Sequence, residues 1–597
     1  MTHLENLRNA TTLDDIARLL GFTPSGLSYV LYKVPSAAKY TSFEIPKRDG
    51  TKRLIRAPAP QLRLLQRRLA NLLYRCLAEI EKGNPGRRSL AHGFAAGRSI
   101  ATNATLHKRR RYVLNLDLED FFPSFNFGRV RGFFIKDRYF ALEEKVATII
   151  AQIACHDNEL PQGSPCSPII SNLIGHVLDA RLARFAKTNK CTYSRYADDI
   201  TFSTSRRDFP PALAAPTVGT TSEWYLGDPL IAKIEAAGFR INHRKTRMQC
   251  RGSRQVTTGL LVNEKVNVLP ECYRTARAMC HSLFKTGSYH RIISAGLVGG
   301  TPGEPHVEKL TSLLPLQGIL AHIDHMKFGL ARKETVKTEG KKRVGKKKER
   351  REASNFRGFR KLYSDFLFYR NFLALSKPLI LPEGKTDTIY LQCAIQQLTA
   401  YQPALGQPVG DKFTYALRFM TYSRTVHEYL QLRGGTGDLI PFISTYTLRT
   451  MAFTRKPMEH PVIILVDNDD GAKEIFATAQ KCGVSPSISY SSTDPFYYLG
   501  ANLYIVKTPE NGTSHRSCME DLFDASIKEE VIDGKTFDPT KDHEAPGKYG
   551  KFVFAEKVVK PRAKTIGFSQ FAPLLDRLVK VLADHSVRFA SPSVAAE

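Results

Sequence analysis

The chain lacks any long hydrophobic run. Its longest strongly apolar stretches, such as residues 462–466, are far shorter than the roughly 18–20 residues that a membrane-crossing helix needs. The N-terminal segment carries Glu5, Asp14 and Asp15 and has no apolar signal core. These absences argue against a membrane helix and a secretory signal. We therefore expect a cytoplasmic protein with no membrane partner.

The chain also lacks the cysteine spacing of zinc-binding modules. Its ten cysteines include no CxxC pair, which excludes the ligand set of zinc ribbons and zinc fingers. Scattered cysteines of this kind are typical of reduced thiols in a cytosolic protein.

Acidic residues are scarce relative to basic ones. The 57 Asp and Glu stand against 87 Lys and Arg, and the formal net charge is +30. The excess is +20 over residues 1–330, +7 over 331–355 and +3 over 356–597. A body as basic as the first part typically binds a polyanion, so nucleic acid is its leading candidate partner.

The residue pattern predicts several folded units. With 42% hydrophobic residues the chain can form sizeable cores, and 597 residues suggest roughly three or four domains. The predicted segments are short helices over 1–35, a hairpin over 41–60 around Asp49-Gly50, a helix over 61–80, alternating strands and helices over 112–270, helices over 271–330, and a solvated basic stretch over 332–351. From Lys377 an alternation of strand, helix, glycine-rich turn and strand predicts a parallel α/β sheet.

Two acidic groups follow strand-like runs in the first part. Asp117 ends an apolar run, and the adjacent Asp198 and Asp199 occupy a tight turn between two apolar strands. Adjacent carboxylates repel each other, so such a group normally needs a cation. Two Mg²⁺ ions about 3.5–4 Å apart, held by three carboxylates, suit phosphoryl transfer. The alternative is that Asp198 and Asp199 only polarise a hairpin turn.

The order of the surrounding motifs resembles that of reverse transcriptases. Tyr196-Ala-Asp198-Asp199 resembles the family's central box, and Asp117 with Phe121 and Phe122 resembles the box that supplies the third metal ligand. The further matches, in family order, are Lys52, Arg53 and Arg56 in the fingers, the Leu160–Pro168 stretch with Gln162 and Gly163, and the stretch 238–246 with Lys245. Five motifs in this order make coincidence remote. The resemblance implies a right-hand polymerase with fingers, palm and thumb.

Site roles follow from this resemblance. It implies that Asp117, Asp198 and Asp199 are catalytic and hold two Mg²⁺ ions, and that Phe122 is the steric gate against a ribose 2′-hydroxyl. It also implies that nucleotide contacts come from Lys52, Arg53, Arg56, Gln162 and Gly163, and a nucleic-acid contact from Lys245. The alternatives are solvated hairpin charges for the three basic residues and a core position for Phe122, whose neighbour Phe121 would face the other way on a strand.

Two further motifs resemble those of retron reverse transcriptases. Asn103 and His107 match an NAxxH signature, and Thr257-Thr258-Gly259 lies where retrons carry VTG, with Thr257 in place of Val. These residues, together with Arg274 and Arg277 on a predicted thumb helix, are candidate RNA or DNA contacts. The alternatives are a surface histidine for His107 and a solvated helix face for the two arginines.

A second acidic cluster lies in the C-terminal part. Glu383 follows one apolar strand, Asp467 and Asp469 follow another, and a glycine-rich segment lies between them. Acids after parallel strands meet at the carboxyl edge of a sheet. Their order resembles a TOPRIM domain, which implies a site with one or two Mg²⁺ ions where Glu383 is the general acid/base and Asp467 and Asp469 are metal ligands. The secondary candidates are Asp387, Asp470, Glu520, Asp521 and Lys551.

Both resemblances together predict a multidomain α+β and α/β protein. The expected segments are an N-terminal helical segment (1–40), fingers and palm (41–265), thumb (266–330), a basic linker (331–355), a Rossmann-like TOPRIM domain (356–525) and its extension (526–597). The resemblance implies a bacterial anti-phage system. In it, the polymerase copies part of a cognate msr–msd-type RNA into branched single-stranded DNA (msDNA), primed by a guanosine 2′-hydroxyl, and the TOPRIM nuclease is a toxic effector with its own nucleic-acid substrate.

Two alternatives and one question stay open. The first alternative is a group II intron-like or abortive-infection reverse transcriptase without a dedicated RNA. The second is a C-terminal domain that serves only in assembly or binding. Homo-oligomerisation on the RNA–DNA hybrid is also undecided by the sequence.

Overall fold

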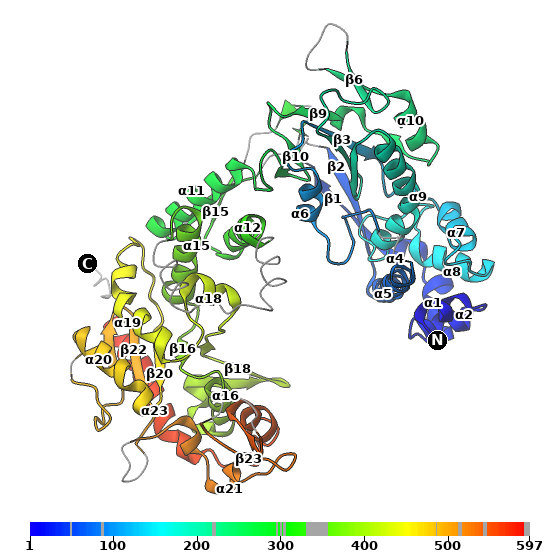
Figure 1. Cartoon of the computed structure of the whole chain (residues 1–597). Helices are drawn as coiled ribbons and strands as arrows, with labels where there is room; N and C mark the ends of the chain where they lie inside the picture. The colour runs from blue at the N-terminus through cyan, green and yellow to red at the C-terminus, as the bar shows by residue number, and fades with distance from the viewer. Residues whose placement is uncertain are drawn as a thin grey trace. The chain divides into compact units, whose positions relative to one another are not determined.

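The structure is a computed structural model of the whole chain (Figure 1). It describes residues 1–47, 51–84, 89–217, 223–293, 297–298, 301–302, 306–329, 356–484, 486–510, 516–540 and 546–589. The predicted Asp49-Gly50 turn and the predicted basic linker 331–355 lie outside these residues. No helix in the described part of the chain is long and apolar enough to cross a membrane.

The chain divides into two compact units. The first comprises residues 1–273, 292–307 and 321–340, and the second comprises 274–291, 308–320 and 341–597. The predicted thumb, 266–330, is therefore shared between the units. Four elements cross the boundaries: α11 (Pro270–Thr286), β12 (Tyr289–Ile293), β15 (His306–Leu310) and α12 (Leu314–Asp324).

Short capped helices begin the first unit, as the residue pattern predicts. Helices α1 (His3–Arg8), α2 (Leu13–Leu19) and α3 (Pro24–Ser28) start after Thr2, Thr12 and Thr23, whose hydroxyls accept hydrogen bonds from backbone N–H groups of the first turn. The predicted hairpin and helix are also present. They are β1 (Tyr40–Pro46) paired antiparallel with β2 (Lys52–Pro58), and the long α5 (Pro60–Gly83).

A five-stranded antiparallel sheet forms the centre of the first unit. The strand order is β4 (Thr192–Tyr196), β5 (Asp199–Thr204), β3 (Tyr112–Glu119) and β8 (Arg240–Ile241), and β9 (Arg247–Cys250) also pairs with β3. Apolar side chains of β3 and β5 share one core with those of α8 (Glu144–Ala154) and α9 (Ser167–Thr188). The helices thereby hold the sheet from which the acidic residues project.

The other elements of the first unit are short, apart from one ten-residue helix. They are η1 (Tyr29–Lys33), α4 (Ser36–Lys39), α6 (Ile100–Leu106), α7 (Phe127–Lys136), β6 (Ala214–Pro216), β7 (Trp224–Leu226), α10 (Asp228–Glu235), η2 (His243–Lys245), β10 (Val256–Thr257), β11 (Leu260–Leu261), β13 (Leu297–Val298), β14 (Thr301–Pro302) and η3 (His325–Gly329).

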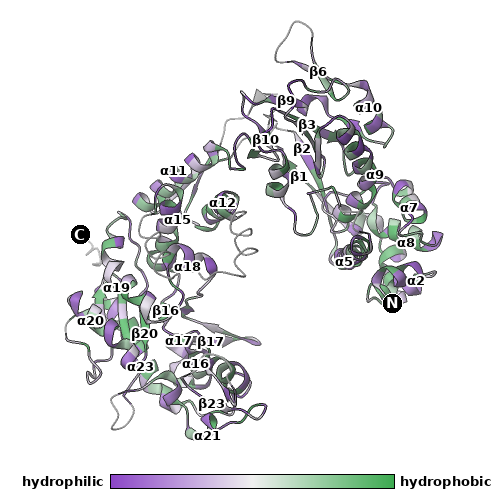
Figure 2. Cartoon of the chain, in the orientation of Figure 1, coloured by the Kyte–Doolittle hydropathy of each residue, from purple (hydrophilic) through white to green (hydrophobic). Residues whose placement is uncertain are grey.

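The second unit contains the predicted parallel α/β sheet. The order is β19 (Arg418–Phe419), β16 (Leu379–Pro382), β20 (Val462–Val466), β22 (Leu503–Lys507) and β21 (Tyr497–Gly500), and only β21 runs antiparallel to its neighbour. Every residue of β16, β20 and β22 is buried, and β20 is hydrophobic throughout (Figure 2). Continuous apolar strands are typical of a parallel sheet covered on both faces.

Helices from both ends of the second unit share its core. Residues of α16 (Asp387–Gln397) and α23 (Ala572–Arg588) pack in one cluster with those of β20 and β22. The described residues of the predicted extension, 526–540 and 546–589, are thus part of the same packed body. The remaining elements are α15 (Phe359–Phe368), η5 (Tyr369–Leu373), η6 (Thr399–Tyr401), α17 (Gln402–Leu405), β17 (Gly406–Val409), β18 (Lys412–Tyr415), α18 (Arg424–Leu430), α19 (Thr436–Thr450), η7 (Asp470–Ala472), α20 (Lys473–Lys481), η8 (Met519–Leu522), α21 (Ala525–Lys528), β23 (Thr536–Phe537), β24 (Lys548–Tyr549), α22 (Lys551–Val553), η9 (Phe554–Val559) and η10 (Ser569–Phe571).

Candidate active sites

The central sheet brings the three predicted carboxylates of the first unit together. Asp117 near the end of β3 lies directly opposite Asp199, the first residue of β5. Asp198 occupies the turn between β4 and β5, and its carbonyl accepts a hydrogen bond from the Leu118 N–H at 3.0 Å. Antiparallel register places facing residues about 4.5–5.5 Å apart at Cα. The backbone pairing, rather than any single side chain, therefore sets this arrangement.

Burial and mutual repulsion define the electrostatics of these carboxylates. Burial, followed by the charge of Asp117, raises the pKa of Asp198. Burial, followed by the charges of Asp198 and Asp117, raises the pKa of Asp199 to about 7. The Lys245 ammonium group lies 3.1 Å and 3.3 Å from the two carboxylate oxygens of Asp117 and offsets part of this repulsion.

The donor set fits a divalent metal ion. All three side chains offer carboxylate oxygens, which Mg²⁺ prefers. Burial and neighbouring negative charge raise the pKa values of Asp198 and Asp199, and a bound cation would offset this repulsion. Among the described residues, however, no three His, Cys, Asp or Glu side chains are arranged so that they could hold one ion. The residue types thus fit the ion, while the side chains do not form a closed ligand set.

A pocket of about 560 Å³ connects the carboxylates with the β1–β2 hairpin. The predicted site residues that line it are Lys52, Arg53, Arg56, Asp117, Phe122, Gln162, Asp198 and Lys245. Gly163 lies beside it at φ +123°, where a Cβ atom would approach the Arg56 carbonyl oxygen to 2.5 Å. The Arg56 N–H in turn donates to the Gln162 carbonyl at 2.8 Å. Residues about 100 positions apart thus form one wall.

The basic side chains of the pocket differ in burial and in their ion pairs. Arg56 is mostly buried and pairs with Glu159 and, at 3.4 Å, with Asp157. Lys52 is exposed and pairs with Glu44 at 2.6 Å. Arg53 is exposed at the pocket and acts electrostatically on Asp198. Arg56 therefore also has a structural role, which the motif match did not predict.

The two neighbouring phenylalanines differ in burial. Phe121 is 4% exposed and stacks on Phe239 in the core, whereas Phe122 is half-buried. Both line the pocket, and Phe122 also packs against the core. The core alternative for Phe122 therefore stays open beside the steric-gate role. Phe94, which the sequence analysis missed, lies 6.2 Å from the Phe122 ring and lines the same pocket. Its φ of +55° is uncommon for a bulky residue and would have needed a structure to detect.

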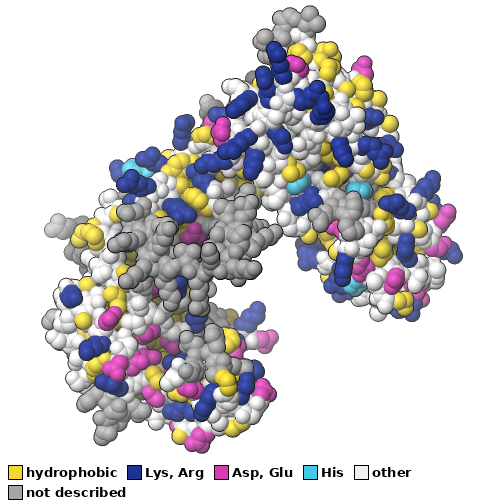
Figure 3. Space-filling view, viewed as in Figure 1, with side chains coloured by type: hydrophobic (Ala, Val, Ile, Leu, Met, Phe, Trp, Pro, Cys, Tyr) yellow, Lys and Arg dark blue, Asp and Glu magenta, His cyan; other side chains and the backbone are white. Residues whose placement is uncertain are grey.

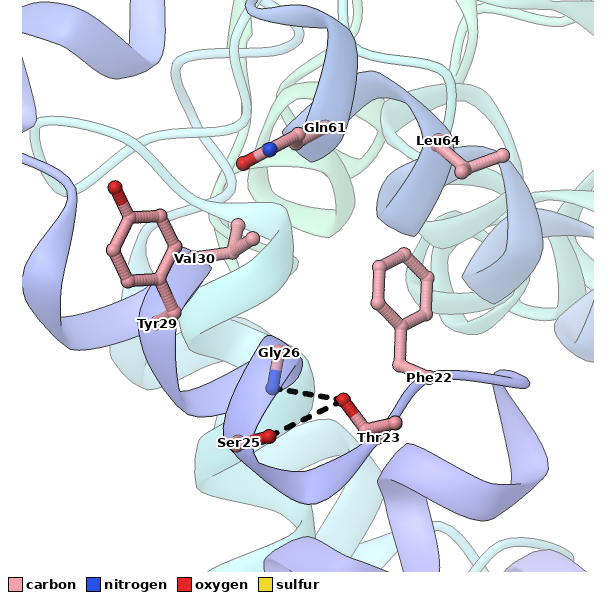
Figure 4. A pocket seen from close by; sticks show the side chains of 8 residues that line it. All are labelled: Phe22, Thr23, Ser25, Gly26, Tyr29, Val30, Gln61 and Leu64. Carbon is pink, nitrogen blue, oxygen red and sulfur yellow. Dashed lines mark hydrogen bonds between the residues drawn. The ribbon is translucent and has the colours of Figure 1, made fainter.

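A different pocket, of about 470 Å³, lies between the N-terminal helices and α5 (Figure 4). Phe22, Tyr29 and Leu64 contribute its apolar lining, and the Thr23 hydroxyl accepts a hydrogen bond from the Gly26 N–H at 3.1 Å. None of the predicted site residues lines it.

Comparison with known proteins agrees with this geometry. Residues 45–269 match the family model described as reverse transcriptase (RNA-dependent DNA polymerase). The chain is 31% identical over 275 residues to the retron Ec86 reverse transcriptase of Escherichia coli, which covers 46% of this chain and 78% of that protein. The chain belongs to the retron reverse transcriptases.

The matches to two other relatives cover a smaller share of the relative's length. The retron Mx162 and Mx65 reverse transcriptases of Myxococcus xanthus are both 36% identical, over 280 and 287 residues. These matches cover 43% and 45% of this chain, and the chain spans 54% and 62% of the two relatives. Apo telomerase from Candida tropicalis aligns with a TM-score of 0.30 and 15% identity, over 41% of this chain and 51% of that one. The family match ends at residue 269, so it does not identify the domain type of the C-terminal half.

The two retron signatures meet at α6 in the first unit. The Thr258 hydroxyl donates to the carbonyl of Ile100, the first residue of α6, at 3.2 Å. Asn103 and His107, in and directly after α6, are fully buried. The surface-histidine alternative for His107 is therefore wrong, and a direct contact of these two side chains with RNA does not fit their burial.

His107 links the two strands of the catalytic hairpin. Its Nδ1 lies 2.7 Å from the Ser203 hydroxyl on β5, and its Nε2 lies 2.7 Å from the Ser194 hydroxyl on β4. Burial, followed by the charge of Arg110, lowers the pKa of His107 to about 3. The imidazole is therefore neutral at physiological pH, with one nitrogen donating and the other accepting.

This burial predicts acid sensitivity. The unfolded chain binds a proton at His107 near pH 6.5, whereas the folded chain does so only near pH 3. Folding stability contributed by the ring is thus complete above pH 6.5 and falls by about 1.4 kcal/mol per pH unit below it. We expect His107→Gln to flatten the loss of unfolding free energy between pH 7 and pH 5, measured by urea denaturation. His281→Gln, at an exposed position, is the control. Equal pH slopes in wild type and His107→Gln would contradict the prediction.

The predicted thumb arginines are exposed. Arg274 and Arg277 both project from α11 toward solvent. On the face drawn in Figure 3, Lys and Arg side chains spread over the first unit, whereas Asp and Glu gather over the second. The charge distribution along the sequence is thus visible on the folded surface.

The sheet of the second unit also gathers acidic residues at its carboxyl edge. Glu383 follows β16, and its N–H donates to the Leu465 carbonyl of β20 at 2.9 Å. Its carboxylate accepts hydrogen bonds from the Thr436 hydroxyl at 2.6 Å and the Asp467 N–H at 3.4 Å. The Asp467 carboxylate accepts one from the Met519 N–H at 3.0 Å. Glu383 and Asp467 therefore lie together, as their positions after neighbouring strands predict.

Three of the secondary candidates join this cluster. Burial, followed by the charge of Glu520, raises the pKa of Asp387 to about 6. Burial, followed by the charge of Asp387, raises the pKa of Asp467 well above its usual range. Glu520 is 1% exposed and pairs with Lys551 at 3.0 Å. These carboxylates fit a divalent cation in type, although, as in the first unit, the described side chains form no closed ligand set.

The other acidic candidates have partners of their own. The Asp469 carboxylate accepts a hydrogen bond from the Gly471 N–H at 2.8 Å. Asp470 is exposed and pairs with Arg516 at 2.7 Å, and Asp521 pairs with Lys528 at 3.8 Å. The acidic candidates thus form two sets. One is the cluster around Glu383 and Asp467, and the other consists of residues that pair with other groups.

The clearest omission of the sequence analysis is Arg195. It lies on β4, three residues before Asp198, and is fully buried against Asp179 of α9. A charged residue inside an otherwise uncharged strand was a signal that it needed a partner. Asp179 could not be identified as that partner from spacing alone, because the two residues meet only through packing of α9 on the sheet.

Proposed function

We propose that the chain is an RNA-directed DNA polymerase of the retron type. It would copy part of a cognate msr–msd-type RNA into branched single-stranded DNA (msDNA), starting from a guanosine 2′-hydroxyl of that RNA. One observation carries this proposal: Asp117 and Asp198 line the same pocket as Arg53, Phe122 and Gln162. Family membership supports the same activity.

The side chains of the pocket have complementary roles in this proposal. Lys52 and Arg53 would neutralise the triphosphate of the incoming nucleotide, since both are exposed at the pocket. Gly163 would let the β1–β2 hairpin pack closely against Gln162, because its missing Cβ leaves room for the Arg56 carbonyl. Mg²⁺ held by Asp117, Asp198 and Asp199 would activate the attacking hydroxyl and stabilise the leaving pyrophosphate. Lys245 would retain the charge balance at Asp117 between turnovers.

A test of this function uses the full chain produced together with its cognate RNA. We expect the purified complex to contain DNA joined to RNA through a 2′–5′ linkage, which debranching enzyme cleaves. DNA synthesis on any primer–template without a branched product would favour the group II intron-like or abortive-infection alternative. Absence of DNA synthesis would overturn the proposal.

Phe122 is expected to discriminate between sugars. Its ring lines the pocket beside the catalytic carboxylates, so replacing it with Ala opens space for a 2′-hydroxyl. We expect Phe122→Ala to reduce the preference for dGTP over GTP by about 10- to 100-fold. The measurement is the ratio of the two kcat/KM values. Phe122→Tyr, which keeps the ring, serves as the matched control, and an unchanged ratio in Phe122→Ala would contradict the steric role.

We also propose that the second unit is a Mg²⁺-dependent nuclease of the TOPRIM type. The supporting observation is the cluster of Glu383, Asp387, Asp467 and Glu520 at the carboxyl edge of a parallel sheet. In this proposal Glu383 is the general acid/base, and the nuclease is a toxic effector of cytoplasmic anti-phage defence in bacteria. The competing hypothesis is an assembly module in which these acids only stabilise the fold.

A further inference from the structure

A buried ion pair lies beneath the catalytic turn. The Arg195 side chain is fully buried and Asp179 is 1% exposed. The guanidinium Nε and Nη2 donate to the two oxygens of Asp179 at 2.7 Å and 2.8 Å, and the Tyr193 hydroxyl donates to the same carboxylate at 2.7 Å. Two parallel hydrogen bonds of this kind fix the orientation of a guanidinium group.

Stability alone does not account for this pair. Removing two charges from water is costly, and replacing a buried ion pair with apolar residues of similar volume is often neutral or stabilising. A further contact of the same guanidinium offers a reason for its retention. Nη1 donates to the Ala197 carbonyl at 2.9 Å. Ala197 directly precedes Asp198, so the ion pair reaches the backbone of the catalytic turn.

The turn itself needs such support. Ala197 has φ +56°, a left-handed conformation that costs a residue other than glycine roughly 1 kcal/mol or more. From another direction, Gly93 approaches so closely that a Cβ atom there would lie 2.6 Å from the Ala197 nitrogen. The Gly93 carbonyl accepts a hydrogen bond from the Asn172 side chain at 2.8 Å. The His92 N–H donates to the Arg195 carbonyl at 2.7 Å.

We propose that Arg195, oriented by Asp179, is a positioning residue that holds the Ala197–Asp198 turn and thereby sets the direction of the Asp198 carboxylate. The inference rests on the proposed polymerase function. Arg195 does not line the pocket, and it acts through the Ala197 carbonyl. Its other neighbours are the Asn172 side-chain oxygen at 3.4 Å and the ring of Phe121, which does line the pocket. The close approach of Gly93 restrains the same backbone.

The test compares Arg195→Met and Arg195→Lys with wild type in single-nucleotide incorporation. We expect Arg195→Met to lower kcat by about 30- to 100-fold, since misplacement of a catalytic group by about 1 Å costs rate on this scale. The nucleotide KM should change less than about threefold, because the pocket residues remain. The Mg²⁺ concentration for half-maximal rate should rise severalfold. Arg195→Lys, which lacks the planar fork, should show the same changes to a smaller extent.

Two further variants keep the result decisive. Gly93→Ala disturbs the turn backbone and leaves the ion pair intact, so it should reproduce the lower kcat and higher Mg²⁺ requirement even if Arg195→Met does not fold. Arg577→Met breaks a different buried ion pair, with Glu510 at 2.8 Å in the second unit, and should leave polymerase kinetics unchanged. Wild-type kcat and Mg²⁺ dependence in folded Arg195→Met or Gly93→Ala would overturn the inference. Absence of DNA synthesis in wild type would instead reject the proposed function.

Discussion

Asp198→Asn is expected to abolish DNA synthesis while leaving the fold at least as stable as in wild type. The loss of one of three carboxylates removes both a metal ligand and negative charge at the reacting centre. We expect the rate to fall by at least about 1,000-fold, equivalent to roughly 4 kcal/mol of activation free energy. The assay is primer extension on RNA with purified protein.

The folding stability of Asp198→Asn should not fall with its activity. Burial and the charge of Asp117 raise the pKa of Asp198, which means that its ionised form destabilises the folded chain. An amide of the same shape removes this repulsion, so the melting temperature of Asp198→Asn should equal or exceed that of wild type. Loss of activity together with a lower melting temperature would indicate unfolding rather than lost chemistry.

A control for this experiment lies in the same unit. Asp208 is exposed and carries the same functional group, ten residues further along the chain. Asp208→Asn should retain wild-type activity and stability. Substantial DNA synthesis by folded Asp198→Asn would contradict the proposed polymerase centre.

Glu383→Gln is expected to abolish the toxicity and the nuclease activity proposed for the second unit. Gln preserves the shape of the side chain, and its amide oxygen can accept the hydrogen bond from the Thr436 hydroxyl. The longer hydrogen bond from the Asp467 N–H, which goes to the other carboxylate oxygen of Glu383, is lost. It cannot exchange a proton at neutral pH. General acid/base groups typically contribute about 100- to 10,000-fold to a rate, so cleavage should fall by at least about 100-fold. Sequencing of nucleic acids from cells that express the native RNA with wild-type or variant chain measures this change.

The polymerase provides an internal reference for the nuclease experiment. Glu383→Gln should leave branched DNA synthesis unchanged, because Glu383 belongs to the second unit. Glu474→Gln, at an exposed position of α20, is the matched control and should retain toxicity. If Glu383→Gln and Asp467→Asn both retain cleavage and toxicity, the assembly hypothesis would replace the nuclease.

Local pattern predicted the elements that carry both sites. Apolar runs identified β16 and β20, because strands of a parallel sheet that is covered on both faces are apolar along their length. Strands β3 and β5 of the antiparallel sheet were identified by the alternation of apolar and polar residues. The acids at the ends of these strands were therefore identifiable without a structure. Their convergence also followed, since antiparallel pairing or parallel order brings strand ends to one edge.

Contacts between distant segments could not be predicted in this way. Spacing could not assign Asp179 to Arg195, nor the hydroxyls of Ser194 and Ser203 to His107, because helical and strand periods describe only neighbours in the chain. The motif match suggested a nucleic-acid contact for His107, whereas packing of α6 places it in the interior. Burial also distinguished Phe121, which is 4% exposed, from the half-buried Phe122, although both line the pocket.

The sequence by itself determined the family, the order of the motifs, the basic character of residues 1–330 and the acids of both clusters. These properties depend on residue identity and local spacing. Only the tertiary structure decided which side chains support those acids, which basic residues are already paired, and which signature residues are buried. Burial and partner choice arise from the packing of one element on another, between residues that lie from 16 to 96 positions apart in the chain, and no local pattern encodes that packing.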